Sequence, residues 1–123
     1  MILITNCSST DTRWSLAPAE FLSAIESEGD PIVLDIYRQE SDRIDMIEGA
    51  KIVNLSNSAD KKALKDLERS EEVYLYCSNG KGSALMKQRL EDLGFTKVYQ
   101  LRGGLKAWED AGYSVVPMPD SGR

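Results

Sequence analysis

The sequence predicts an α/β fold in which helices cover both faces of a mostly parallel central sheet. Two runs, at 32–36 and 73–76, are almost entirely apolar, which is typical of strands that are buried on both faces. Segments with helical spacing alternate with such runs at short intervals, and this alternation indicates right-handed crossovers around a parallel sheet. The length fits one domain over residues 1–123, with a core at about 14–116 and a loose tail at 117–123.

The first half of the chain predicts two helices and two strands. Pro18 suits the first turn of a helix, and Gly29 suits its end. Further on, Ala63, Leu64 and Leu67 share one face of a second helix. In order, we expect a helix at 17–28, a strand at 32–36, a charged surface connection at 37–48, a strand at 51–55 and a helix at about 60–69.

The second half predicts two further strand and helix pairs. Met86, Leu90 and Leu93 follow each other at helical spacing, and Gly94 ends that helix. In order, we expect a strand at 73–76, a helix at 81–93, a strand at 97–101 and a last helix that opens at Gly103-Gly104 and closes at Gly112. In this half of the chain each strand is followed by a helix, the usual connection between parallel strands.

The residue types present exclude several classes of enzyme site. The chain has no histidine, so it cannot build a Ser-His-Asp triad, a Cys-His pair or a histidine-containing zinc site. Its two cysteines, Cys7 and Cys77, are too few for a four-thiolate metal site or a disulfide-stapled scaffold. We therefore expect reduced thiols, no bound metal, and a structural rather than reactive Cys7.

Charge and hydropathy limit the partners of the chain. Fifteen Lys and Arg face twenty Asp and Glu, so the net charge of -5 repels phosphate backbones, and we expect no nucleic acid partner. Apolar stretches such as 31–36 are far shorter than the roughly 20 residues of a membrane-spanning helix. The N-terminus also lacks the basic region of a secretion signal. We expect a cytoplasmic protein with no membrane partner.

One segment carries the pattern of a reaction site. Cys77 stands at the end of an apolar strand, directly before a loop that contains glycines and the start of a helix. Ligands of open α/β sheets bind beyond the carboxyl ends of strands, where a helix also presents unpaired N–H groups. Gly80 and Gly82 allow the positive φ that turns successive N–H groups toward an anion such as a thiolate, and Lys81 adds charge. The predicted site has Cys77 as nucleophile and a substrate-binding loop of Ser78, Asn79, Gly80, Lys81, Gly82 and Ser83.

Residues 77–83 resemble the active-site loop of the rhodanese-like sulfurtransferases. Two further patterns of that family occur in the right order, and together with the loop they cover roughly residues 17–116. They are Leu34-Asp35-Ile36 followed by Ile47-Glu48-Gly49-Ala50, and Gly94-Phe95 followed by Val98-Tyr99-x-Leu101-x-Gly103-Gly104-x3-Trp108. The resemblance implies the rhodanese-like version of the α/β fold.

The resemblance also implies an activity. A rhodanese-type sulfurtransferase moves a sulfane sulfur from thiosulfate or a persulfide to a thiol or cyanide acceptor, here through a persulfide on Cys77, and it needs no cofactor. The implied partners are a small sulfur donor and a thiol acceptor, which a protein can supply. Asp35 is expected to be structural, holding neighbouring loop backbone, and Gly103 and Gly104 are expected to serve the geometry of the fold.

Three positions depart from the family pattern. Tyr37 stands where an Arg is usual, Met46 where a His is usual, and Gly82 where many members carry an Arg. Without an Arg at position 82, anion binding must rest on backbone N–H groups and Lys81. The three departures together keep open a non-catalytic rhodanese-like module that binds a partner or only carries sulfur. A phosphatase or arsenate reductase of the Cys-x5-Arg type ranks third, because the place of its Arg is Ser83.

Overall fold

The computed structural model describes residues 14–27, 29–37, 44–54 and 57–119. The main sheet contains β1 (Ser15–Leu16), β2 (Ile32–Tyr37), β4 (Lys51–Asn54), β5 (Val73–Tyr76) and β6 (Val98–Leu101). These strands lie in the order β1-β6-β5-β2-β4, and every neighbouring pair is parallel. The predicted α/β fold with a mostly parallel central sheet is therefore confirmed.

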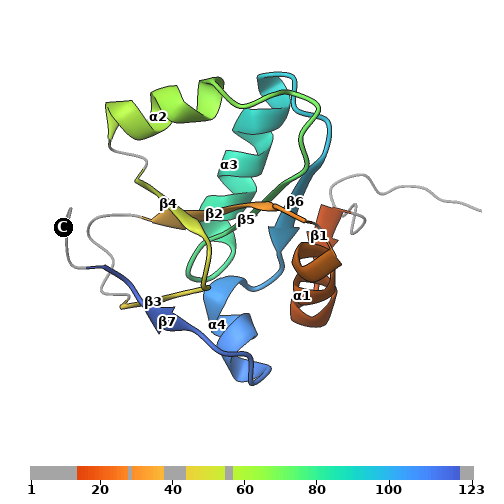
Figure 1. Cartoon of the computed structure of the whole chain (residues 1–123), viewed down its shortest axis with the longest axis vertical. Coiled ribbons are helices and arrows are strands. Elements are labelled where there is room, and N and C mark those ends of the chain that lie inside the picture. The colour runs from red at the N-terminus through yellow and green to blue at the C-terminus, as the bar shows by residue number, and fades with distance from the viewer. Residues whose placement is uncertain (1–13, 28, 38–43, 55–56, 120–123) are drawn as a thin grey trace, which may run out of the picture.

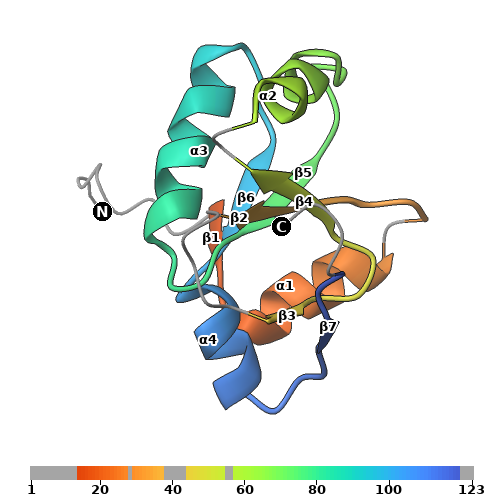
Figure 2. The same cartoon turned by 90° about the vertical axis from the view of Figure 1, so that its left-hand side faces the viewer.

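Helices cover both faces of this sheet, as the sequence predicts. They are α1 (Pro18–Ser27), α2 (Ser58–Lys65), α3 (Lys81–Asp92) and α4 (Gly104–Asp110). Figure 1 shows α2 and α3 on one side of the sheet and α1 and α4 on the other, and Figure 2 shows the same division after a quarter turn. Among the residues that the structure describes, no helix combines the length and the apolar character needed to cross a membrane.

Strand β5 lies at the centre of the sheet, and all four of its side chains are buried. Successive side chains of a strand point to opposite faces. Val73 and Leu75 therefore join the core under α2 and α3, whereas Tyr74 and Tyr76 join the core that α1 and α4 cover. Cys77 follows the strand and belongs to the first of these cores. The cysteine thus lies at the carboxyl end of the central strand, on the side of α3.

Helix α2 begins and ends earlier than its prediction, because polar contacts at its two ends, and not its apolar positions, set its bounds. The prediction was about 60–69, and the helix occupies 58–65. The side chain of Asn57 accepts the N–H of Asp60 at 3.0 Å, which fixes the earlier start. The guanidinium of Arg69 donates to the carbonyl oxygen of Lys65 at 3.2 Å, so a side chain satisfies the end of the helix.

A second, two-stranded antiparallel sheet was not predicted. It pairs β3 (Asp45–Met46) with β7 (Val116–Pro117). The N–H of Met118 donates to the carbonyl of Ile44 at 2.8 Å, and Met118 packs against Met46, each 7% exposed. The prediction of a loose tail is therefore wrong for residues 117 and 118, and 45–46 are more than a surface connection. Predictions for Cys7, Leu55 and 120–123 lie outside the described residues.

Candidate active site

The sulfur of Cys77 is held by backbone N–H groups. Its side chain is buried, with 5% of the residue exposed. The N–H of Gly80 donates to Sγ at 3.1 Å, and the N–H of Ser83 donates to it at 3.2 Å. Two N–H dipoles that converge on one sulfur stabilise negative charge on that atom. This pair of donors is the cradle that the glycine-containing loop predicts.

The loop folds this way because one glycine adopts a left-handed conformation. Gly80 precedes α3 and has a φ of 96°, which a residue with a β carbon rarely adopts. The side chain of Asn79 accepts the N–H of Lys81 at 3.0 Å and so closes the turn. Gly82 is not among the described glycines with positive φ. The prediction that both glycines supply positive φ is therefore right for Gly80 and wrong for Gly82.

Ser83 brings a hydroxyl to the same sulfur. The residue is fully buried, and its Oγ lies 3.6 Å from Sγ of Cys77. The same hydroxyl donates to the carbonyl oxygen of Gly80 at 3.2 Å. The serine therefore ties the first turn of α3 to the loop and gives the sulfur a third polar neighbour.

Helix α4 supports the loop from the other side. The N–H groups of Leu105 and Lys106 donate to the carbonyl oxygens of Cys77 and Ser78, at 2.8 and 3.1 Å. The two views agree that the loop between β5 and α3 lies beside the start of α4 (Figures 1 and 2). These bonds fix the direction of two successive peptide groups, and hence the path of the loop that carries the N–H donors.

This close approach requires glycine at position 104. A β carbon there would lie 2.5 Å from the carbonyl oxygen of Cys77 and 2.7 Å from the backbone nitrogens of Asn79 and Gly80. Real β carbons essentially never come so close to other atoms. Gly103 differs, because its β carbon would meet Ala107 of the same helix at 2.6 Å. Sequence reasoning gave both glycines a part in the fold and missed that Gly104 contacts the sulfur-binding loop.

Asp35 and Tyr76 form a buried polar contact on the other face of the sheet. The hydroxyl of Tyr76 donates to Oδ2 of Asp35 at 2.8 Å, and it accepts the N–H of Ile47 at 2.9 Å. Both side chains are fully buried. Asp35 therefore helps to tie β2 and β5 to the turn after β3, and its carboxylate lies on the opposite face from Sγ of Cys77. The role of Tyr76 was not predicted, because its hydroxyl lies within an apolar run.

The family is now clear from comparison with known proteins. The model of the Rhodanese-like domain family matches residues 17–111, which extend from α1 through α4 and include the whole loop. This chain belongs to the rhodanese-like domain family. The family includes sulfurtransferases, and curated thiosulfate sulfurtransferases are among the relatives of this chain.

Individual relatives of this rhodanese-like chain are distant. It is 26% identical over 106 residues to the thiosulfate sulfurtransferase GlpE of Actinobacillus pleuropneumoniae serotype 7 (strain AP76), covering 86% of this chain and 95% of GlpE. It is 37% identical over 60 residues to the protein YqhL of Bacillus subtilis (strain 168), covering 49% of this chain and only 46% of YqhL. The crystal structure of the Alr3790 protein from Anabaena sp. matches with a TM-score of 0.69 and 26% identity, over 84% of this chain and 82% of that chain.

The predicted site residues of the rhodanese-like loop differ in what they contact. Gly80 and Ser83 contact the sulfur directly. Ser78 and Asn79 use polar atoms to hold the loop, through the start of α4 and the N–H that follows. Lys81 is exposed, and among the described contacts only its backbone takes part in the loop.

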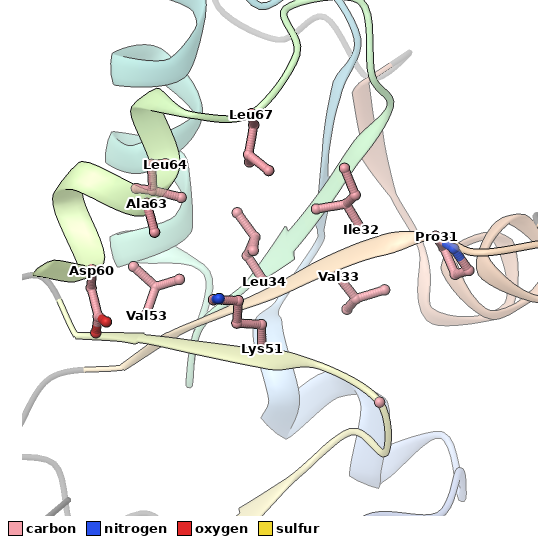
Figure 3. A pocket seen from close by; sticks show the side chains of 11 residues that line it. Pro31, Ile32, Val33, Leu34, Lys51, Val53, Asp60, Ala63, Leu64 and Leu67 are labelled. Atoms are coloured by element: carbon pink, nitrogen blue, oxygen red, sulfur yellow. The ribbon is translucent and has the colours of Figure 1, made fainter.

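Two pockets of the rhodanese-like fold lie away from this loop. One, of about 250 Å³, lies between α2 and the strands β2 and β4, and Figure 3 shows apolar side chains such as Leu34, Leu64 and Leu67 around it. The other, of about 430 Å³, is lined from α1, from the turn before β4 and by Trp108. None of residues 77–83 lines either pocket. The candidate site therefore does not coincide with either of these cavities.

Proposed function

We propose that this rhodanese-like protein is a sulfurtransferase that carries a sulfane sulfur as a persulfide on Cys77. The observation that carries the proposal is the convergence of the N–H groups of Gly80 and Ser83 on Sγ, at 3.1 and 3.2 Å. Fixed N–H donors aimed at a reacting atom stabilise the charge that it carries during reaction. The likeness to a thiosulfate sulfurtransferase over 95% of that relative supports the same chemistry.

The first step is attack of the Cys77 thiolate on the sulfane sulfur of the donor. With thiosulfate, a bond forms between Sγ and that sulfur, the sulfur–sulfur bond of the donor breaks, and sulfite leaves with the electron pair. With a persulfide donor, a thiolate leaves in the same way. The two N–H donors hold the Cys77 sulfur throughout, so no histidine base is needed.

The second step returns Cys77 to its starting form. An acceptor thiolate, or cyanide in an assay, attacks the outer sulfur of the persulfide, and the Cys77 thiolate leaves. The Ser83 hydroxyl, 3.6 Å from Sγ, stays beside the sulfur in both steps. Gly82 supplies no guanidinium, so a donor with less negative charge than thiosulfate is favoured relative to family members that carry an Arg there.

The test is intact-mass analysis after incubation with thiosulfate or with glutathione persulfide. We expect the gain of one sulfur, about 32 Da, and peptide mapping should place it on Cys77. Cys77→Ser should abolish the gain, and Cys7→Ser is the matched control that should keep it. Loading on Cys7, or loading that persists in Cys77→Ser, would refute the mechanism. Absence of any loading would instead favour a non-catalytic module.

A further inference from the structure

The loop around Cys77 lies in the longer of two stretches in the second half of the chain that contain no acidic residue. Residues 73–90 and 93–108 together carry six of the fifteen Lys and Arg and none of the twenty Asp and Glu. They include the loop, most of α3 and the start of α4. In a protein with a net charge of -5, the segment that carries the candidate site, 73–90, thus holds three cations and no acidic residue. Such asymmetry attracts partners of negative charge.

The exposed face of α3 carries two of these cations, and it leads away from the loop. Lys81, Leu85 and Arg89 are spaced four residues apart and are all exposed, Leu85 to 51%. Residues at this spacing lie along one face of a helix. At 1.5 Å of rise per residue, Lys81 and Arg89 are about 12 Å apart along the helix axis. We call these three residues the α3 stripe.

The cations of the α3 stripe have no acidic partner within the described residues. By contrast, Lys87 pairs with Glu91 at 2.7 Å, and Lys106 pairs with Asp110 at 3.1 Å. Lys81 also opens the helix, where the positive end of the helix dipole disfavours a cation, and the first turn of α3 holds no acidic residue. The charge of Lys81 thus destabilises the start of α3 and has no acidic partner among the described residues. This indicates that Lys81 serves contact with another molecule.

We propose that the α3 stripe binds an acidic polypeptide whose cysteine exchanges sulfur with Cys77, an inference that rests on the proposed function. A small anion would reach Lys81 alone, whereas the spacing to Arg89 and the apolar surface of Leu85 fit a chain that lies along the helix. Cys77 is only 5% exposed, so a partner cysteine must be guided to the sulfur above the loop. A contact made through three side chains buries little surface, and contacts of small area are typical of weak, transient complexes.

The exchange is balanced without any oxidant or reductant. The partner thiolate attacks the outer sulfur of the Cys77 persulfide, and a new sulfur–sulfur bond forms on the partner cysteine. The bond between that sulfur and Sγ breaks, and its electron pair stays on Sγ as the Cys77 thiolate. The reverse sequence loads Cys77 from a persulfide on the partner.

The experiment compares acceptors for the sulfur of preloaded protein. The acceptors are two peptides of about twelve residues, long enough when extended to span the α3 stripe, and each contains one central cysteine and one leucine. The other positions are Asp and Glu in the acidic peptide and Asn and Gln in the neutral peptide. Transfer to neutral β-mercaptoethanol sets the reference rate. We expect the acidic peptide to react at least about fivefold faster than the neutral peptide at low salt, with this advantage lost at high salt. Equal rates would overturn the proposal.

Variants locate the contact on α3. Arg89→Gln and Leu85→Asn should each reduce the advantage of the acidic peptide about threefold, relative to β-mercaptoethanol. Lys97→Gln removes the same charge from an exposed position just before β6, at the far end of the sheet, and should leave the advantage unchanged. Equal effects of Arg89→Gln and Lys97→Gln would show that only net charge matters, and the α3 stripe would lose its role.

A binding measurement separates this inference from the proposed function. A fluorescent acidic peptide with serine in place of its cysteine should bind the parent protein more tightly than it binds Arg89→Gln, by fluorescence anisotropy. If that difference appears but Cys77 never gains sulfur, the docking surface stands and the sulfurtransferase proposal fails. If Cys77 gains sulfur but the acidic peptide binds no better than the neutral one, the docking surface fails and the sulfurtransferase proposal stands.

Discussion

Replacing Gly104 with alanine tests whether α4 holds the Cys77 loop in its active shape. The change adds one β carbon at the point where the helix meets the loop. That carbon would lie 2.5 Å from the carbonyl oxygen of Cys77 and 2.7 Å from two backbone nitrogens, one of them the Gly80 N–H donor to Sγ. All three atoms belong to backbone, so the loop or the helix must move by several tenths of an ångström.

The size of the effect follows from two costs. Gly104 has a φ of 68°, and an alanine at such an angle costs about 1–2 kcal/mol. Forcing an extra carbon into packed backbone adds about 1–3 kcal/mol. Gly112 is the matched control, because its φ is 89° and its β carbon would meet nothing within 4 Å. The difference between the two variants therefore isolates the overlap with the loop.

Urea unfolding measures the loss of stability in Gly104→Ala, and the rate of persulfide loading measures the change in the loop. In urea unfolding, Gly104→Ala should lose about 1–3 kcal/mol more than Gly112→Ala. The rate of persulfide loading on Cys77 should fall about 10- to 100-fold in Gly104→Ala, because a displaced N–H donor no longer stabilises the sulfur. Loading by Gly112→Ala should stay within about twofold of the parent, since this glycine lies away from the loop.

The refuting result is a folded Gly104→Ala protein that loads sulfur at the rate of the parent. It would mean that the loop keeps its N–H donors in place without the support of α4. Gly103→Ala provides a second comparison, because its β carbon would strike Ala107 within α4 rather than the loop. Equal loading defects in Gly103→Ala and Gly104→Ala would show that α4 matters only as a whole.

Three further predictions concern the surroundings of the site. Tyr76→Phe should lower the free energy of unfolding by about 1–3 kcal/mol, because the buried N–H of Ile47 loses its acceptor. A loss below about 0.5 kcal/mol in urea unfolding would contradict this prediction. Lys81→Ala should lower kcat/KM for thiosulfate roughly fivefold at low salt and less at high salt. Lys62→Ala on α2 should leave kcat/KM unchanged, and equal values for the two variants would show that Lys81 does not face the donor. Gly82→Arg should raise kcat/KM for thiosulfate about fivefold more than for a persulfide donor, and equal changes for both donors would contradict the proposed effect of the missing guanidinium.

The centre of the fold and the identity of the loop could be predicted from local patterns. The run at 73–76 is apolar throughout, and the observed strand has the same bounds. A parallel sheet places ligand sites beyond the carboxyl ends of its strands. Cys77 directly follows this strand, so it could be predicted to lie at such an end. Gly80 at the end of the loop then predicted the left-handed turn that the structure has. These features depend on residues close together in sequence.

The missed features depend on contacts between distant segments. The strands β1, β3 and β7 have two residues each, too few to show any alternation. The bonds from α4 to the loop join backbone groups, which leave no trace in side-chain patterns. Only a glycine pair marked that contact, and glycine is required there by a neighbour more than twenty residues earlier. The hydroxyl of Tyr76 was likewise hidden in a strand that is apolar for its length.

On the proposed function, the groups that hold the sulfur differ in range from the groups that would recognise a partner. At Sγ the donors are neutral N–H groups, which act over a short range on any sulfur species bound there. The cations Lys81 and Arg89 are exposed and act through solvent over about 8–10 Å. An arginine at position 82 would join the two functions, because its β carbon would lie 3.6 Å from Cβ and 3.7 Å from Sγ of Cys77. Since Gly82 supplies no such group, selection for a particular oxyanion is weak at the sulfur itself. On the proposed function, discrimination among donors and acceptors then passes to the outer surface of α3, where a polypeptide partner has more to contact than a small anion.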